Sequence, residues 1–273
     1  MSNDRGGDVG VVVVSGGTNG MGRAFALGRA ERGDRVLVLG RSRERGEAMA
    51  GGLIAFLPVD LSSTAETRQV IEHILGEYQV VDALALFANA VAPRRIETVE
   101  GLERTFALYY VSRYLLSFGL RPALDRATAP VIVNVAGVGV TKGAVRWTDP
   151  QMTAGYSAVA AQLQAGRAND LLGVGFAQRS GSRARYVLYH PGFTRSGDRS
   201  ALPFVVRGLL AVAAAVAARS VADAVAPIHR FLDAPPTAPL TAVDRGKRLP
   251  PRFPTLDPHD AERLMDLTER LLR

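Results

Sequence analysis

The 273-residue sequence contains no cysteine, which excludes disulfide bonds and thiolate metal sites. The four histidines lie far apart in the sequence: His73, His190, His229 and His259. We therefore expect no metal centre. Lysine is almost missing, since Lys142 and Lys247 are the only two, and arginine supplies most of the positive charge. The arginines are spread along the chain without a basic run, so we expect no nucleic-acid partner.

Long hydrophobic runs are also missing. The longest, at 208–218, has 11 residues between Arg207 and Arg219 and is too short to cross a hydrocarbon core. The first ten residues are polar and carry no apolar signal-peptide core. We therefore expect no membrane span, and the cytoplasm is the expected location.

Short apolar segments rich in Val and Leu alternate with helical segments along the chain. They lie at 9–16, 35–40, 53–59, 80–88, 130–137 and 184–190. Near-continuous apolar runs of this length are typical of parallel strands buried on both faces, with crossover helices between them. With 47% apolar residues and no linker, the sequence predicts one α/β domain over 1–273 with a doubly wound, Rossmann-type sheet.

Capping residues predict where several helices begin. Ser62 is the expected N-cap of a helix that ends near Tyr78, and Ser220 precedes Asp223 at the spacing of a capping box. Asp257 followed by Pro258 predicts a C-terminal helix over 258–272.

Glycines follow the first strand in the order Gly16, Gly20, Gly22, directly before a helical segment. Such glycines let the backbone approach a pyrophosphate, which the helix N-terminus stabilises. The sequence therefore predicts a dinucleotide site. From this segment we expect the cofactor to meet Ser15, Gly16, Thr18, Asn19, Gly20, Met21 and Gly22.

The end of the second strand, "GRSR", bears on the identity of the dinucleotide. A site for NAD has an acidic residue there for the ribose hydroxyls, whereas this chain places Arg41, and with it Arg43, where a 2′-phosphate would lie. The arginines favour NADP(H); the alternative is that both are merely solvated.

Four motifs in series carry a family resemblance: "SGGTNGMG", "VDLSS", "FANAV" and "HPGFT". In order and spacing they resemble the short-chain dehydrogenase/reductase superfamily over residues 9–273, with features of its retinol-dehydrogenase type. The resemblance implies that Asp60 and Leu61 lie by the adenine, Asn89 and Ala90 by the adenine ribose, and Pro191, Gly192 and Thr194 by the nicotinamide carboxamide. Val91 departs from the family, which usually has glycine at that position.

Members of this family use an Asn, Ser, Tyr, Lys catalytic set, and the resemblance implies a position for each. The segment "VNVAG" places Gly137 at the serine position, and "GLERTFALYYVSRYLL" places Tyr109 at the asparagine position. The tyrosine and lysine have two alternative registers. Taking Tyr156 as the tyrosine puts Ala160 at the lysine and leaves an unusually long interval to the "HPGFT" motif.

The better register aligns "GRAN" with the family's Lys-x-Ala-Asn, which puts Gln162 at the tyrosine and Gly166 at the lysine. In this register Tyr156 is a second, non-catalytic tyrosine. Gln162 cannot supply a proton, although its amide could donate a hydrogen bond to an oxyanion. Tyr156 or Tyr109 could act as a substitute acid or could simply pack, and we assign His190 a structural role.

The segment at 195–219 is expected to form a substrate lid, and its apolar character suits a bulky apolar metabolite. A homo-oligomer interface or a contact with a membrane surface would explain it equally well.

Three functions follow from the sequence. The first is an NADP(H)-binding enzyme with non-standard chemistry such as cyclisation, isomerisation or dehydration, with the cofactor bound with or without redox turnover. The second is an NADPH-dependent ketoreductase that uses a substitute acid. The third is a catalytically silent NADP(H)-binding sensor or partner protein.

Overall fold

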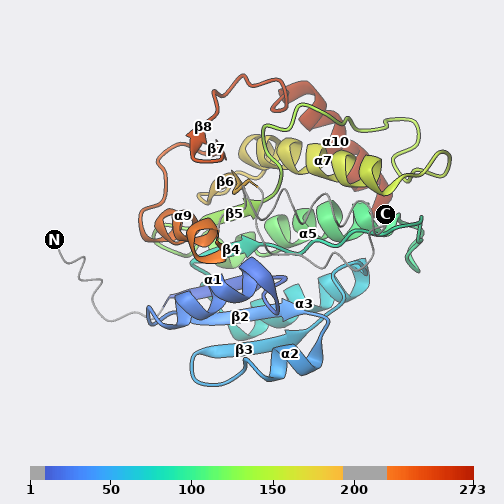
Figure 1. Cartoon of the computed structure of the whole chain (residues 1–273). Helices are drawn as coiled ribbons and strands as arrows, with labels where there is room; N and C mark the ends of the chain where they lie inside the picture. Colours follow the sequence, from blue (N-terminus) through green and yellow to red (C-terminus); the bar gives the residue numbers. More distant parts are fainter. Residues whose placement is uncertain (1–9, 193–219) are drawn as a thin grey trace.

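An eight-stranded sheet forms the centre of the computed structural model, which describes residues 10–192 and 220–273 (Figure 1). The strands are β1 (Val11–Ser15), β2 (Arg35–Gly40), β3 (Ile54–Pro58), β4 (Ala83–Leu86), β5 (Val131–Val135), β6 (Arg185–His190), β7 (Leu240–Asp244) and β8 (Lys247–Arg248). Their order is β3-β2-β1-β4-β5-β6-β7-β8, with every pair parallel except β7 and β8. This is the predicted doubly wound α/β sheet.

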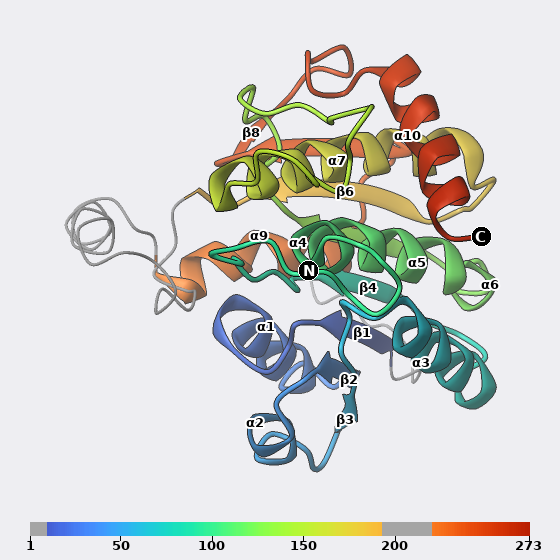
Figure 2. The same cartoon turned by 90° about the vertical axis from the view of Figure 1, so that its right-hand side faces the viewer.

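The helices cover both faces of the sheet. They are α1 (Gly20–Ala30), α2 (Arg43–Glu47), α3 (Thr64–Glu77), α4 (Arg104–Phe106), the π-helical turn η1 (Ala107–Val111), α5 (Ser112–Gly119), α6 (Arg121–Leu124), α7 (Ala158–Arg179), α9 (Val221–Asp233) and α10 (Pro258–Leu271). Figure 2 shows α1 and α9 on one face, and α3, α5, α7 and α10 on the other.

Each face of the sheet has its own apolar core. Val12 and Val14 pack toward α1 and α9, whereas Val13 packs toward the layer of α3, α5 and α7. Because successive side chains of a strand point to opposite faces, a continuous valine run serves both cores at once. All six apolar segments predicted as strands are strands in the structure.

Helix caps agree with the sequence except at one position. Ser220 and Asp257 cap α9 and α10 as predicted, but the N-cap of α3 is Ser63, whose side chain accepts a hydrogen bond from the Glu66 N–H. The prediction of Ser62 was wrong by one residue, because the Ser62 hydroxyl donates to the Asp60 carboxylate at 2.7 Å instead.

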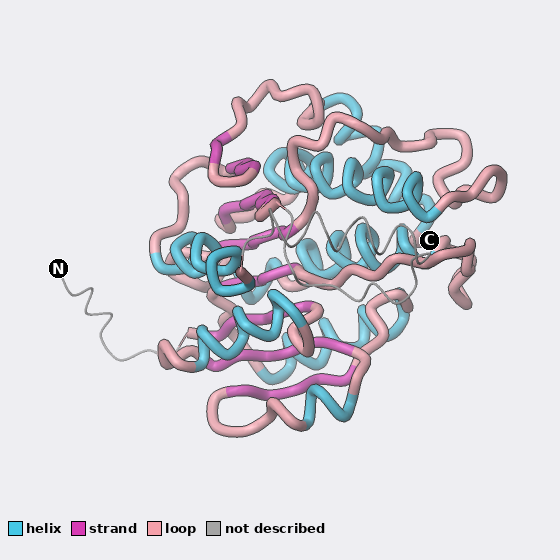
Figure 3. Tube along the Cα trace, in the orientation of Figure 1, coloured by secondary structure: helices cyan, strands magenta, loops and turns pink. Residues whose placement is uncertain are grey.

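Two long connections leave the carboxyl ends of β4 and β5, at 87–103 and 136–157 (Figure 3). Ligands of doubly wound folds bind at this edge, next to the point where the strand order reverses. Here the reversal lies between β1 and β4. Among the described residues, no helix has the length and apolar character needed to span a membrane.

Candidate active site

A cleft opens at the carboxyl ends of β1, β4, β5 and β6. It is lined by residues at the carboxyl ends of β1 to β6 and by two residues of η1: Gly16, Thr18, Asn19, Gly20, Met21, Gly22, Gly40, Arg41, Ser42, Arg45, Val59, Leu61, Phe87, Ala88, Asn89, Ala90, Val91, Leu108, Tyr109, Val135, Ala136, Gly137, His190, Pro191 and Gly192. Most residues that the sequence assigns to the cofactor therefore share one cavity.

The glycine loop has backbone geometry that other residues would not tolerate. Gly16 has φ +70°, and a Cβ atom there would lie 2.7 Å from the backbone of Ala88. A Cβ on Gly22 would lie 2.3 Å from the Gly16 carbonyl oxygen. The Asn19 side chain caps α1 by accepting from the Gly20 N–H at 2.8 Å, which leaves other N–H groups of the first turn available for an anion.

Ser15 lies behind this loop and not in the cleft lining. It is fully buried, and its hydroxyl accepts from the Ala88 N–H at 3.5 Å. Ser15 therefore joins β1 to the chain after β4, which makes it a supporting residue of the glycine loop.

Positive charge enters the cleft from the end of β2 and from α2. Arg41 and Arg45 line the cavity, and Arg43 does not. Arg41 also lies 3.8 Å from the Asp60 carboxylate, which is itself held by the Ser62 N–H at 2.9 Å. A pair of guanidinium groups at this place fits a phosphate on the adenosine ribose.

Gln162 reaches from α7 to the motif that follows β4. Its amide nitrogen donates to Asn89 Oδ1 at 3.2 Å and to the Ala90 carbonyl at 3.0 Å, and its oxygen accepts from Asn89 Nδ2 at 3.2 Å. Both N–H groups of the amide are thus engaged within the protein. Gln162 therefore holds the Asn89 side chain in place, and it has no N–H left for an oxyanion in this arrangement.

Tyr109 lies on the cleft wall at the centre of the π-helical turn η1. Asn169 of α7 donates to the Tyr109 carbonyl at 2.7 Å, and the Gly137 N–H donates to the Tyr109 hydroxyl. Burial raises the pKa of Tyr109, and the charge of Arg113 opposes that shift without cancelling it. The phenol therefore remains protonated at neutral pH and can only donate a proton.

Gly137 and Gly166 have space where a side chain would lie. A Cβ on Gly137 would meet only Val140, at 3.6 Å, and a Cβ on Gly166 would meet nothing within 4 Å. Gly137 lines the cleft, and Gly166 lies one helical turn beyond Gln162 on α7. No packing reason excludes a serine or a lysine at these positions.

Tyr156 is placed away from the cleft lining, before the first turn of α7. Its hydroxyl donates to the Ala92 carbonyl at 2.8 Å, and partial burial raises its pKa. Tyr156 thus bonds to the chain after β4 at Ala92, whereas Gln162 bonds to Asn89 and Ala90.

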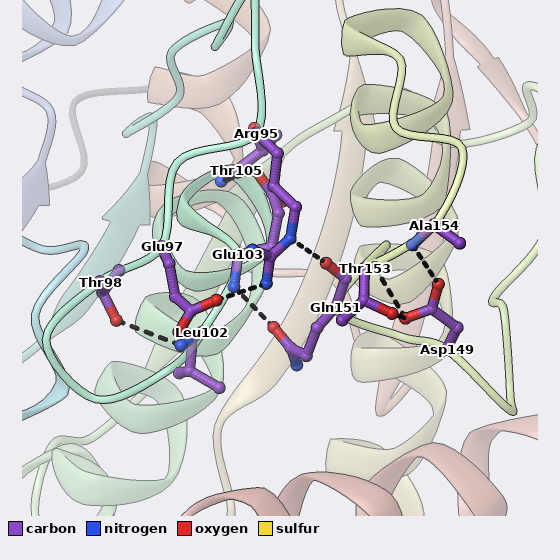
Figure 4. A network of polar contacts seen from close by, with 10 residues as sticks. All are labelled: Arg95, Glu97, Thr98, Leu102, Glu103, Thr105, Asp149, Gln151, Thr153 and Ala154. Carbon is purple, nitrogen blue, oxygen red and sulfur yellow. Dashed lines mark hydrogen bonds and ion pairs between the residues drawn. The ribbon is translucent and has the colours of Figure 1, made fainter.

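A polar network joins the two long connections (Figure 4). The Glu103 N–H donates to the Gln151 side chain at 2.6 Å, and Arg95 donates to the Gln151 carbonyl at 3.0 Å. The buried Glu103 carboxylate in turn caps α4, accepting from Thr105 and Phe106 at 2.8 Å each. These bonds fix one wall of the site to the start of η1.

Two buried charged residues were not foreseen from the sequence. Arg113 on α5 donates to Asn134 and to the carbonyls of Val135 and Ala88, the last two at 2.9 Å each. Asp170 on α7 is 1% exposed, and burial raises its pKa to about 7 against the opposing effects of Arg167 and the Gly139 N–H. In the sequence both look like ordinary polar residues of amphipathic helices.

His190 lines the cleft at the end of β6, and its Nδ1 lies 2.8 Å from Asp244 Oδ1. Pro191 and Gly192 follow it in the lining, as predicted from the "HPGFT" motif. Thr194 and the expected lid at 195–219 lie outside the described residues.

Comparison with known proteins identifies the family. The sequence model of the short chain dehydrogenase family matches residues 10–158. Bovine (Bos taurus) retinol dehydrogenase 12 is 28% identical over 195 residues, which cover 68% of this chain and 62% of the bovine protein. The chain therefore matches less than two thirds of the length of that relative.

Solved structures with the same fold include a short-chain dehydrogenase from Streptomyces avermitilis, with a TM-score of 0.64, 20% identity, and coverage of 98% of this chain and 97% of that one. A second is the NADP active-site complex of RhlG from Pseudomonas aeruginosa, with a TM-score of 0.65, 21% identity, and coverage of 87% and 95%. The chain belongs to the short-chain dehydrogenase family.

Proposed function

We propose that the protein binds NADP(H) and transforms a bulky apolar metabolite without the tyrosine and lysine that its family uses. One observation carries the proposal: the cleft is lined by most of the predicted cofactor residues together with Tyr109 and Gly137, and Gln162 of α7 bonds to Asn89 in that lining. The resemblance assigns Tyr109, Gly137, Gln162 and Gly166 to the four catalytic positions. Relative to the family, the residues of the cofactor motifs are kept, and the residues that transfer the proton are replaced.

The choice of NADP(H) over NAD(H) rests on the two arginines of the cleft. Arg41 and Arg45 offer guanidinium groups to a 2′-phosphate, and no acidic side chain lines the cavity beside them among the described residues. Asp60, the nearest carboxylate to Arg41, is held by Ser62. The glycine loop would hold the pyrophosphate, and Asn89, already oriented by Gln162, would meet the adenosine ribose.

The residues at the tyrosine and lysine positions favour non-standard chemistry, because they cannot donate a proton as the family's tyrosine does. NADPH supplies a hydride when bound, and a carbonyl that receives a hydride must also receive a proton. Gln162 has no acidic proton, and glycine at 137 and 166 has no side chain. Cyclisation, isomerisation or dehydration needs a shaped apolar cavity and proton exchange, and does not require the family's tyrosine.

Reduction of a ketone with Tyr109 as the acid is the second candidate. The phenol lies on the cleft wall, takes a hydrogen bond from the Gly137 N–H and faces the Arg113 cation. An alkoxide is a far stronger base than a phenolate, so a tyrosine with a raised pKa can still protonate it. The cation beside the ring would stabilise the phenolate that forms.

Binding and turnover experiments separate these functions. Calorimetric titration with NADP⁺ and NAD⁺ tests the cofactor, and NADPH with a panel of polycyclic ketones, retinal and their alcohols tests turnover by absorbance and by mass of the products. Products formed without net oxidation of NADPH support non-standard chemistry. Oxidation that is lost in Tyr109→Phe and kept in Tyr156→Phe supports the reductase.

Two results would count against both enzyme functions. Tight NADP⁺ binding with no conversion of any compound in the panel would favour a silent sensor or partner protein. If the protein did not bind NADP⁺, the proposed function would be wrong.

A further inference from the structure

A histidine and a carboxylate meet at the edge of the cleft where β6 and β7 end. The parallel register of these strands pairs His190 directly with Asp244, and the Arg245 N–H donates to the His190 carbonyl at 2.8 Å. The side chains of the paired residues are also in contact, because Nδ1 of the His190 imidazole lies 2.8 Å from Asp244 Oδ1. The contact is thus built into the sheet and not into a loose surface loop.

Asp244 is kept ionised by its neighbours. Partial burial tends to raise its pKa, but hydrogen bonds from Arg245 and His190 outweigh burial and lower it. Arg245 donates to both carboxylate oxygens, at 3.1 Å and 3.2 Å from Nε and at 2.9 Å from Nη2. Arg245 takes an unusual left-handed backbone conformation, φ +48°, in the turn between β7 and β8, which places its guanidinium against the carboxylate.

An ionised carboxylate beside Nδ1 fixes the tautomer of the imidazole. It accepts the Nδ1 proton, so in the neutral ring Nε2 carries the lone pair. Within the described part of the chain Nε2 has no hydrogen-bond partner, while the ring itself lines the cleft next to Pro191 and Gly192. A histidine ordered in this way can take a proton on Nε2 and return it.

The other ionisable groups of the described cleft lining cannot play both roles. The guanidinium groups of Arg41 and Arg45 have hydrogen-bond donors and no acceptor. Tyr109 is held in its neutral form by burial, so it can donate a proton and cannot accept one at neutral pH. Imidazole is the ionisable side chain of the described lining that has both a donor nitrogen and an acceptor nitrogen in its neutral form.

We propose that His190 is the general acid–base residue of this cleft and that Asp244 is the residue that positions it. The proposal rests on the proposed function, since it supplies the proton chemistry that Gln162 and Gly166 do not. In an isomerisation or dehydration, Nε2 takes a proton from a carbon next to the substrate carbonyl; the C–H bond breaks, the N–H bond forms, and the electron pair stays on the substrate as an enolate. The imidazolium then returns that proton to another carbon or to a departing hydroxyl, which leaves as water.

Asp244 stabilises the imidazolium during this step, because a positive ring beside an ionised carboxylate gains a charge-assisted hydrogen bond. It also keeps the ring from rotating Nδ1 toward the cleft. Loss of Asp244 should therefore change the tautomer of His190 before it changes anything else in the fold.

The first test needs no substrate and uses the whole chain labelled with ¹⁵N-histidine. Long-range proton–nitrogen spectra at pH 8 should show His190, assigned by its loss in His190→Asn, with a protonated Nδ1 and an unprotonated Nε2. Addition of NADP⁺ should shift the Nε2 signal, while the exposed His73 should not respond. Asp244→Asn should increase the Nε2-protonated tautomer.

An Nε2-protonated ring in the wild type, or no response of Nε2 in a protein that binds NADP⁺ by calorimetry, would overturn the proposal. Failure to bind NADP⁺ at all would instead overturn the proposed function, so the two failures are distinguishable.

The second test uses whichever compound of the ketone, retinal and alcohol panel the wild type converts. His190→Asn retains an N–H toward Asp244 and removes Nε2, the nitrogen opposite the Asp244 contact. It should therefore lower kcat by about 100-fold or more, while the Kd for NADP⁺ stays within about threefold. His73→Asn is the matched control and should keep full activity. A folded His190→Asn variant with kcat within threefold of wild type would contradict the proposal, and His190→Gln serves as a second variant if Asn impairs folding.

Discussion

The guanidinium carbon of Arg113 lies 4.7 Å from the centre of the Tyr109 ring. Arg113 is completely buried, and its bonds to Ala88, Asn134 and Val135 tie the ends of β4 and β5 to α5. The cation thus lies beneath the wall of the cleft that Tyr109 forms.

Arg113→Met should destabilise the protein by about 3 to 5 kcal/mol, because it leaves three buried acceptors without their donor. Urea unfolding followed by circular dichroism measures the loss. Arg183→Met, which removes an exposed arginine bonded to Thr128 at 3.4 Å, should change the free energy of unfolding by less than about 0.5 kcal/mol. Equal effects of the two substitutions would contradict the structural role of Arg113.

Asp170 should make stability depend on pH in a direction unusual for a carboxyl group. Its pKa is raised from 3.8 to about 7 in the folded chain, so between these values the folded state holds a proton that the unfolded state has lost. Stability should therefore fall as pH rises from about 4 to about 7, by an amount on the order of 4 kcal/mol.

Asp170→Asn should remove this dependence and raise the free energy of unfolding at pH 8 by a few kcal/mol. Urea unfolding at half-unit steps of pH measures the free energy of unfolding of both proteins. The effects of the other carboxyl groups cancel in the difference between the variant and the wild type. Glu72→Gln, on the exposed side of α3, serves as the control and should leave the curve unchanged. If the free energy of unfolding changed with pH in the same way in Asp170→Asn and in the wild type, the Asp170 carboxyl would not be protonated at neutral pH.

Arg41 and Arg45 should determine the preference for NADP⁺ over NAD⁺. The double substitution to alanine removes two charge-assisted contacts to a 2′-phosphate and should weaken NADP⁺ binding by about tenfold or more, with little effect on NAD⁺. Arg43→Ala is matched in charge and lies outside the cleft lining, so it should bind both dinucleotides as the wild type does. Calorimetry at two salt concentrations checks the result, and equal losses for both dinucleotides would contradict a phosphate contact.

Gly166→Lys should be accepted by the fold, because a side chain there meets no atom within 4 Å of its Cβ. Lysine also has a higher helix propensity than glycine, by up to about 1 kcal/mol. If the site faces the cofactor, the new ammonium should tighten NADP⁺ binding by about tenfold. The measurements are urea unfolding and calorimetry.

The matched control is Gly175→Lys on the same helix, where a Cβ would lie 2.8 Å from Met265. We expect it to lose several kcal/mol of stability. A Gly166→Lys variant that is as unstable as this control would mean that position 166 does not face open space, and with it the register that places Gln162 at the cofactor motif would fail.

The sequence predicted the sheet because its signals are local. Continuous valine runs, a glycine triplet after the first strand, and capping residues such as Ser220 and Asp257 act within a few residues of one another. The register that the "GRAN" segment gives Gln162 stays a prediction.

What the sequence did not predict depends on contacts between distant residues. His190 and Asp244 are 54 positions apart and meet only because β6 and β7 pair in one register. Arg45, and not Arg43, enters the cleft because α2 begins at Arg43 and rotates the two side chains apart. A single sequence carries no local sign of either arrangement.

The order of the strands bears on how the chain assembles as it is synthesised. The first three strands pair with one another. β4 then joins the free edge of β1, and β5, β6 and β7 each join the strand before them, in the order in which they leave the ribosome. The half of the cleft that we propose for the adenosine can therefore form from the first 90 residues, whereas Asp244 reaches His190 only when β7 has been added. If both proposals hold, a nascent chain would pass through a stage with its dinucleotide loop in place before His190 gains its carboxylate partner.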